Sequence, residues 1–259
     1  MIILNEKEYV SDMLRKKEFG TSKIYLFLSI YARYLYQEEG LRKTGIVKKL
    51  HEFMDSNYPQ YNPVDWSISI EKYASKAGQY PLCQCDGIWI TEKELNTVDN
   101  LHNKVLERLA FTLLCLAKFG NFRNPQNHSW VTNSNGEIYT MACINTPAFQ
   151  KDLKISQLKE AGLLEYARKV DNLNIRVLFV DDESEKKLFV SDFRKLGYEW
   201  LLYKGSNYIR CTSCNVLTKN TNGKRRYCKE CAQARKKELD RTRMQHIRNL
   251  SCCEKEESA

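Results

Sequence analysis

Apolar residues recur at helical spacing through the first part of the chain, and glycine or proline separates the runs. The pattern predicts helices over Glu6–Phe19, Ser22–Gln37, Thr44–Asn57 and Pro63–Lys76. In the second of these runs apolar residues fall on most sides of the helix, which is typical of a helix inside a bundle. The N-terminal region is therefore expected to be a helical bundle.

The strongest periodic signal begins at Thr91 and Glu94. These residues have the form of a capping box, in which a Thr side chain caps the helix and an acid three residues later reaches back. Apolar residues then continue at helical spacing to about Phe119. The sequence predicts one long helix across this stretch.

The elements become shorter after Ser129. The expected order is a strand at Trp130–Val131, a helix over Glu137–Ile144, a helix capped by Thr146, and strands over Leu163–Arg168 and Asn174–Val180. Gly162 ends the second helix, whose apolar residues include Phe149, Leu153 and Leu158. Beyond the strands we expect a solvated, charged connector over Asp181–Lys187 and a short helix that stops at Gly197.

This order of a helix, a short helix, a helix with a glycine stop and a hairpin is that of a winged helix-turn-helix. The segment from Leu158 to Leu164, LKEAGLL, resembles the junction between recognition helix and wing in that superfamily. The resemblance covers about residues 91–180. It implies a DNA-contacting helix that ends at Gly162, followed by a wing.

Four cysteines near the C-terminus form two C-x2-C pairs, Cys211 with Cys214 and Cys228 with Cys231. Two short turns of this kind can each offer a pair of thiolates to one tetrahedral Zn²⁺. No further ligand or water position is evident, so we expect a single, closed, structural zinc ion. A redox role is disfavoured because the redox C-x2-C motif normally stands alone.

The residues between the cysteine pairs predict a zinc ribbon. Asn215 follows the first pair and tolerates the left-handed backbone angles that such a turn needs. Asn222 and Gly223 form a strong hairpin signal, which predicts that Val216–Lys219 pairs with Arg225–Tyr227. After Cys231 a helix is expected, rich in Lys and Arg and without a continuous apolar stripe.

Positive charge is concentrated in this C-terminal part. The chain has a formal net charge of +9, yet residues 204–248 hold 13 basic and 3 acidic residues, or +10, which leaves −1 for the remainder. Such asymmetry indicates a polyanionic partner, with a solvated basic face as the alternative. Sequence motifs of nucleophile elbows, phosphate-binding loops and zinc proteases are absent. We therefore expect a protein that is not an enzyme.

The first hypothesis is a DNA-binding protein. The winged helix would contact duplex DNA through Gln150 and Gln157 and through the basic residues Lys151, Lys154, Lys159, Arg168, Lys169 and Arg176. The ribbon and basic helix would add phosphate contacts from Lys224, Arg225, Arg226, Arg235, Lys236, Lys237, Arg241 and Arg243. RNA is a second possible ligand, because a basic helix does not distinguish the two nucleic acids.

The alternative hypothesis is a protein-binding adaptor or inhibitor of host machinery that uses the helical and winged-helix surfaces. The whole-chain pattern is similar to uncharacterised proteins of phages and integrated elements in Gram-positive bacteria. The similarity lies in Leu109–Cys115, in Asp192–Tyr198 and in the terminal cysteine module. It implies a mobile-element protein of the bacterial host cytosol and carries no activity with it. The DNA-binding hypothesis includes a regulatory or replication-related role in such an element. Neither a signal peptide nor a membrane-spanning run is recognisable.

Together these patterns predict an α+β protein, mainly α with small β structure. We expect a helical N-terminal region (1–80) and a winged-helix-like domain (81–183). A connector with the four-cysteine zinc ribbon (184–231) and a basic helix with a tail (232–259) complete the chain.

Overall fold

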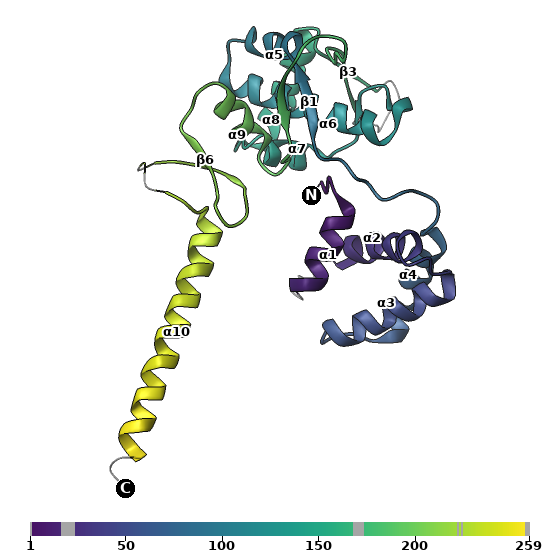
Figure 1. The fold of residues 1–259 in the computed structure, drawn as a ribbon. Helices are drawn as coiled ribbons and strands as arrows, with labels where there is room; N and C mark the ends of the chain where they lie inside the picture. The colour runs from purple at the N-terminus through teal and green to yellow at the C-terminus, as the bar shows by residue number, and fades with distance from the viewer. Residues whose placement is uncertain (1, 17–23, 168–173, 222, 224, 257–259) are drawn as a thin grey trace. The chain divides into compact units, whose positions relative to one another are not determined.

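The computed structural model of the chain describes residues 2–16, 24–167, 174–221, 223 and 225–256, with the backbone alone at residue 16 and over 246–256 (Figure 1). In this part helices predominate and small antiparallel sheets accompany them, so the protein is mainly α with small β structure, as expected. The chain divides into two compact units, Met1–Ile88 and Trp89–Ala259. The junction falls at the first strand, β1 (Ile88–Thr91).

Helices α1 (Glu6–Lys16), α2 (Ile24–Gln37), α3 (Lys43–Asn57) and α4 (Pro63–Lys76) form the first unit. Their apolar faces meet in a core that contains Phe27, Leu28, Leu50 and Ile70, all essentially inaccessible to solvent. The predicted helices are thus present, while the expected Ser22 cap lies outside the described residues. Burial of α2 on most sides follows from its apolar residues, because burying each large side chain contributes about 1.5–3 kcal/mol.

Helix α6 (Lys104–Arg123) is the central element of the second unit. Its residues from Leu109 to Ala117 are buried all round the helix. It contacts α5 (Glu92–Asp99), α7 (Asn135–Met141), α8 (Ala148–Glu160) and α9 (Leu196–Tyr203). A short 3-10 turn, η2 (Pro125–Asn127), follows it.

The single long helix predicted from Thr91 to Phe119 is wrong, because α5 and α6 are separate helices. The Thr91–Glu94 capping box is confirmed and starts α5. The chain then turns at His102, whose φ of 47° is left-handed. Asn103 caps α6 by accepting hydrogen bonds from the backbone N–H groups of Val105 and Leu106. Apolar periodicity continues across the break and conceals it in the sequence.

A three-stranded antiparallel sheet lies beside α6, in the order β2-β4-β3. The strands are β2 (Trp130–Val131), β3 (Leu164–Tyr166) and β4 (Ile175–Val177). Val131 lies opposite Ile175, and Leu164 lies opposite Val177. All three predicted strands are present, β2 with the predicted bounds and β3 and β4 with shorter ones, and β2 pairs with the hairpin as its third strand.

Helix α8 ends as predicted but begins differently. Gly162 adopts a left-handed φ of 76° after the helix, and its N–H donates to the carbonyl of Lys159. The predicted Thr146 cap is wrong, because Pro147 occupies the cap position without a side-chain hydrogen bond. The Thr146 hydroxyl instead donates to the side-chain oxygen of Gln150 at 2.8 Å.

The charged connector predicted over Asp181–Lys187 is largely solvated, since Asp182, Glu183 and residues 185–187 are exposed, but its first residues also form contacts with the core. Lys118, 8% exposed, donates to the fully buried Glu94 at 2.8 Å and pairs with Asp182 at the same distance. The Asp181 backbone N–H donates to Glu94 at 2.8 Å. Hydrogen bonds from the side chain and backbone of Ser184 lower the pKa of Asp181 to about 2. Asp181 is therefore structural, while Asp182 and Glu183 remain exposed. Strand β5 (Lys186–Val190) then pairs with β1.

The predicted helix stop at Gly197 is wrong, because this residue lies inside α9. A Cβ atom placed there would come within 1.9 Å of the carbonyl oxygen of Ala142, at the end of α7. Glycine is needed at this position because the two backbones approach too closely for a side chain. The remaining elements are β6 (Tyr208–Arg210), β7 (Leu217–Lys219) and α10 (Lys229–Glu256).

Candidate metal centre and the basic segment around it

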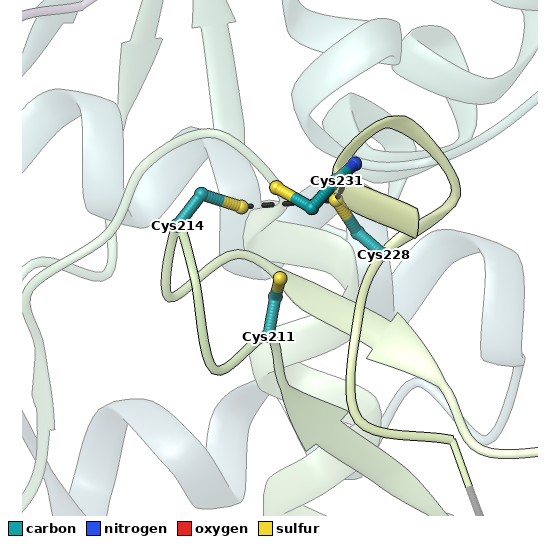
Figure 2. A group of neighbouring side chains, drawn as sticks. All are labelled: Cys211, Cys214, Cys228 and Cys231. Carbon is teal, nitrogen blue, oxygen red and sulfur yellow. Dashed lines mark hydrogen bonds between the residues drawn. The ribbon is translucent and has the colours of Figure 1, made fainter. Parts of the chain in front are cut away.

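The four cysteines of the two C-x2-C pairs converge on one point. Their sulfur atoms all lie within 4.8 Å of one another, and those of Cys214 and Cys228 are 3.7 Å apart. Figure 2 shows the four side chains turned toward a common centre. Metal–sulfur bonds of about 2.3 Å in a tetrahedron give sulfur–sulfur edges of about 3.8 Å. The cluster therefore fits a metal ion held by four thiolates.

The first cysteine pair is the turn of a β-hairpin. Strands β6 and β7 are antiparallel, with Arg210 opposite Leu217. Between them the Cys211 N–H donates to the carbonyl of Val216 at 2.9 Å. Asn215 has a φ of 60°, so its predicted left-handed conformation is confirmed.

The predicted strand pairing across Asn222 and Gly223 is wrong. Strand β7 pairs with β6, and residues 225–227 form no strand. The carbonyl of Arg226 accepts hydrogen bonds from the N–H and the hydroxyl of Thr212, at 3.0 Å and 2.8 Å. The cysteine turn itself closes the hairpin, and Arg226 is bonded to that turn. Asn222 lies outside the described residues, while Gly223 has a left-handed φ of 65°.

The second cysteine pair starts α10. Cys228 immediately precedes the helix, and Cys231 lies in its first turn. The Cys231 N–H donates to the Cys228 sulfur, and the Ala232 N–H donates to the carbonyl of Cys228. The positive end of a helix dipole favours negative charge, so this placement stabilises thiolates. A metal at the centre would tie the start of α10 to the β6–β7 hairpin.

The thiols differ in acidity although they lie close together. Burial alone would raise the pKa of Cys211, but hydrogen bonds from backbone N–H groups, the Cys228 and Cys214 amides among them, lower it to about 6. Burial raises the pKa of Cys214 to about 12, and the neighbouring thiols raise it further. Without a cation the four groups therefore do not ionise together, and a metal that binds all four must displace protons.

Helix α9 and the residues before it support the cysteine module. Arg194 forms a fork on Asp192 and also donates to the carbonyl of Cys214 at 2.8 Å. Arg210 pairs with the buried Glu199 at 2.9 Å. These charge-assisted contacts fix both ends of the first cysteine turn on the second unit.

Further contacts join this support to α6 and leave a cleft beside the cysteines. The rings of Tyr198 and Tyr208 lie 4.6 Å apart. The indole N–H of Trp200 donates to Glu107 on α6 at 3.0 Å. A cleft of about 370 Å³ next to the cysteines is lined by Arg194, Lys195, Tyr198 and Lys229, among others. Lys195 and Lys229 bring positive charge to this cleft, which Glu230 also lines, while Arg194 is paired with Asp192.

The structure describes all the C-terminal basic residues named above except Lys224. Arg225, Arg226, Arg235, Lys236, Lys237, Arg241 and Arg243 are exposed. Arg225 donates to the carbonyl of Lys219 at 3.0 Å, and Arg235 donates to the Tyr227 hydroxyl at 2.9 Å. All described side chains of α10 from Ala232 to Gln245 are exposed, so this part of the helix is surrounded by solvent.

The described basic residues of α8 and β4 make more contacts within the protein than those of α10. Lys151 and Lys159 lie over the rings of Tyr139 and Tyr166, at 5.5 Å and 4.8 Å from the centroids. Arg176 lies on β4, where it donates to the carbonyl of His128 at 3.1 Å. Lys154 is half-buried, and Arg168 and Lys169 lie outside the described residues.

Two residues that the apolar pattern of α8 assigns to its core side lie in solvent. Phe149 is 72% exposed and Leu153 is 56% exposed, while Ile155 and Leu158 are buried. The sequence contains a signal of this, because the helical phase of the apolar residues changes near Ile155. The outward side of α8 is therefore more apolar than its lysines suggest.

Comparisons of the chain with protein-family models, with curated protein sequences and with solved structures find no match. Within the part of the chain that the structure describes, no helix has the length and apolar character needed to cross a membrane. The functional interpretation therefore depends on the residues themselves: the four converging thiols, the basic segment attached to them, and α8.

Proposed function

We propose that the chain is a zinc-containing, non-enzymatic nucleic-acid-binding protein whose ligand is DNA in preference to RNA. One observation carries the proposal: residues 204–248 hold a net charge of +10, and the described cations of the cysteine module and α10 are exposed. Exposed, clustered Lys and Arg bind phosphates by releasing condensed counterions. A basic face that only aids solubility would not require the positive charge to be concentrated in one segment.

Zinc is the metal that fits the cysteine cluster best. Four thiolates at tetrahedral separations are a structural zinc donor set, and the cluster has no carboxylate or histidine ligand. The β6–β7 hairpin and the start of α10, each contributing a C-x2-C pair, support the interpretation as a form of zinc ribbon. The ion would be structural, holding the basic helix against the hairpin.

The elements of the middle region support the winged-helix interpretation. Helices α6, α7 and α8 are followed by the β3–β4 hairpin, with β2 between α6 and α7 and a sheet order of β2-β4-β3. In a winged helix-turn-helix the helix before the hairpin enters the major groove. By this analogy α8 is the recognition helix. A regulatory or replication role in a mobile element is compatible with such a protein.

Binding of the full, zinc-loaded chain to duplex DNA and to RNA of the same sequence, measured by fluorescence anisotropy across a salt series, tests this function. We expect tighter binding to DNA and a steep fall in affinity with salt. Absence of binding to either nucleic acid at low salt would refute the proposal. Capture of one protein partner, unaffected by nuclease, would then favour the adaptor hypothesis.

A further inference from the structure

Two exposed aromatic rings lie together on the small β1–β5 sheet. Trp89 on β1 is 44% exposed and Phe189 on β5 is 40% exposed, and their ring centroids are 5.0 Å apart. Their neighbours Ile90 and Val190 are fully buried, because side chains alternate between the two faces of a strand. The sheet therefore covers the core with one face and presents the ring pair to solvent with the other.

A lysine and a third exposed ring extend this surface. Lys187 lies two residues before Phe189 on β5 and therefore on the same face. The pKa of Lys187 is raised mainly by its hydrogen bond to Glu185 and, to a smaller extent, by the charge of an ionised Tyr203 on α9. Tyr203 thus lies near this ammonium, and it is 46% exposed. We call Trp89, Phe189 and Tyr203 the aromatic surface.

The charges around the aromatic surface do not by themselves attract phosphate. Lys187 pairs with Glu185 at 3.0 Å and lies 4.0 Å from Glu92. Lys204, at the end of α9, pairs with Asp99. Two lysines thus accompany three carboxylates, so this part of the surface carries no positive excess. What it offers to a partner is aromatic area.

We infer that the aromatic surface stacks the unpaired bases of a single-stranded nucleic acid, an inference that rests on the proposed nucleic-acid-binding function. Every base has a flat face that can stack on an aromatic side chain, whatever the sequence. The bases of a duplex already stack on one another and present such faces only at the ends. The exposed cations of α10, in the same unit, hold the phosphates of either form, and the aromatic surface adds affinity for the unpaired one.

The ion pairs beside the rings favour a single strand over a protein as the occupant. A stable protein interface covers about 800 Å² on each partner. Such an area would take Lys187, Glu185 and Glu92 out of water together with the rings, and the removal of charged groups from water is costly. A single strand is narrower. Its bases cover the rings while its phosphates and the three charged side chains stay in solvent.

The experiment uses the full-length, zinc-loaded chain and three ligands of equal length. They are a single-stranded oligothymidine, an abasic strand that keeps the sugars and phosphates, and a duplex. We expect the chain to bind the oligothymidine about 5- to 150-fold more tightly than the abasic strand for each stacked base. The two strands carry the same phosphates, so their affinities should fall equally with salt.

Tryptophan emission reports the same contact without any substitution. Trp66 and Trp200 are buried and Trp130 is half-buried, so Trp89 is the exposed member of the four tryptophans. A base stacked on an indole ring quenches its emission. We expect the oligothymidine to quench the emission of Trp89 and the abasic strand to leave it nearly unchanged.

Variants assign the effect to the aromatic surface. Trp89→Ala should remove most of the difference between the oligothymidine and the abasic strand, with the salt dependence and the affinity for the duplex unchanged. Trp89→Phe keeps a ring and should retain most of the difference. Phe122→Ala removes a ring that is 54% exposed at the end of α6 and serves as the matched control, with no change expected. A melting temperature close to that of the parent checks that each variant is folded.

Two results would overturn the inference, and they differ in what they mean for the proposed function. If the chain binds the oligothymidine and the abasic strand equally and its tryptophan emission does not change, the aromatic surface stacks no bases, while the proposed function stands. If no ligand binds even at low salt, the proposed function fails and the inference fails with it.

Discussion

One face of α10 should supply most of the phosphate contacts. Lys229, Lys236 and Arg243 recur every seven residues, which is close to two helical turns or about 10.5 Å, and therefore share a side of the helix. Arg241 on another side pairs with Glu238 at 3.9 Å. A straight helix that lies along a nucleic acid presents one side to it. We expect the seven-residue stripe to be that side.

The perturbation is the triple change of Lys229, Lys236 and Arg243 to Gln. Each phosphate contact contributes about 0.9 to the slope of log affinity against log salt, so three lost contacts reduce the slope by about 2.7. A fourfold rise in salt would therefore weaken the parent about 40-fold more than the variant. Fluorescence anisotropy with a labelled duplex, titrated at several salt concentrations, measures both slopes.

The matched control removes the same charge from the first unit. Lys48, Lys49 and Lys72 are exposed, and their triple change to Gln alters the net charge equally. This control should leave the slope unchanged. Equal slopes for the two triple variants would refute the reasoning, because total charge and not one face of α10 would then govern binding.

Three further predictions, one of them with a matched glycine control, concern the metal centre and the core. Cys211→Ser should lower bound zinc from one per chain to well below one, measured by metal analysis, and should expose residues beyond about 204 to protease while the helical core stays folded. Gly197→Ala places a Cβ 1.9 Å from a carbonyl oxygen at the end of α7 and should lower the free energy of unfolding by about 1–3 kcal/mol in urea titrations. Gly45→Ala, inside α3 with its nearest contact at 3.6 Å, should instead raise it by about 0.5–1 kcal/mol. Lys118→Met removes the cation paired with the fully buried Glu94 and should lower the free energy of unfolding by about 3–5 kcal/mol, whereas the added change Glu94→Gln should restore much of the loss.

Each of these predictions has an opposing result. Full zinc content in Cys211→Ser would show that the cluster does not depend on all four thiols. A Gly197→Ala variant as stable as the parent would contradict the close packing of α7 against α9. A Lys118→Met variant that unfolds like the parent would mean that water reaches the Glu94 carboxylate.

Local signals in the sequence predicted local features well. The Thr91 capping box, the left-handed Asn215 and the Gly162 stop depend on neighbours within a few residues, and all three are confirmed. The close approach of the cysteine pairs also follows from spacing, because each pair needs only a short turn. The residues that determine each of these features are close to it in the sequence.

Some of the errors concern contacts between distant segments. Glycine is required at position 197 because the main chain at the end of α7 lies against it. The backbone of Asp181 is held by a hydrogen bond to Glu94, a buried carboxylate about 90 residues earlier in the sequence. Neither partner is visible in the local pattern. The exposure of Phe149 has the same cause, because the side of α8 that is buried depends on α6 and the β3 strand. Tertiary contacts of this kind decide which apolar residues reach solvent.

The metal would act on nucleic-acid binding through position and not through charge. A zinc ion held by four thiolates carries about −2, so a loaded site makes the module less positive. The zinc ion would contribute by fixing the position of α10. The described part of this helix buries no apolar stripe, so packing alone does not hold it in place. Attachment through Cys228 and Cys231 joins the basic stripe to the hairpin, which Arg194 and Arg210 connect to α9. If α10 contacts phosphates as proposed, it would do so as part of one connected unit, and binding would lose less conformational entropy than with a free basic tail.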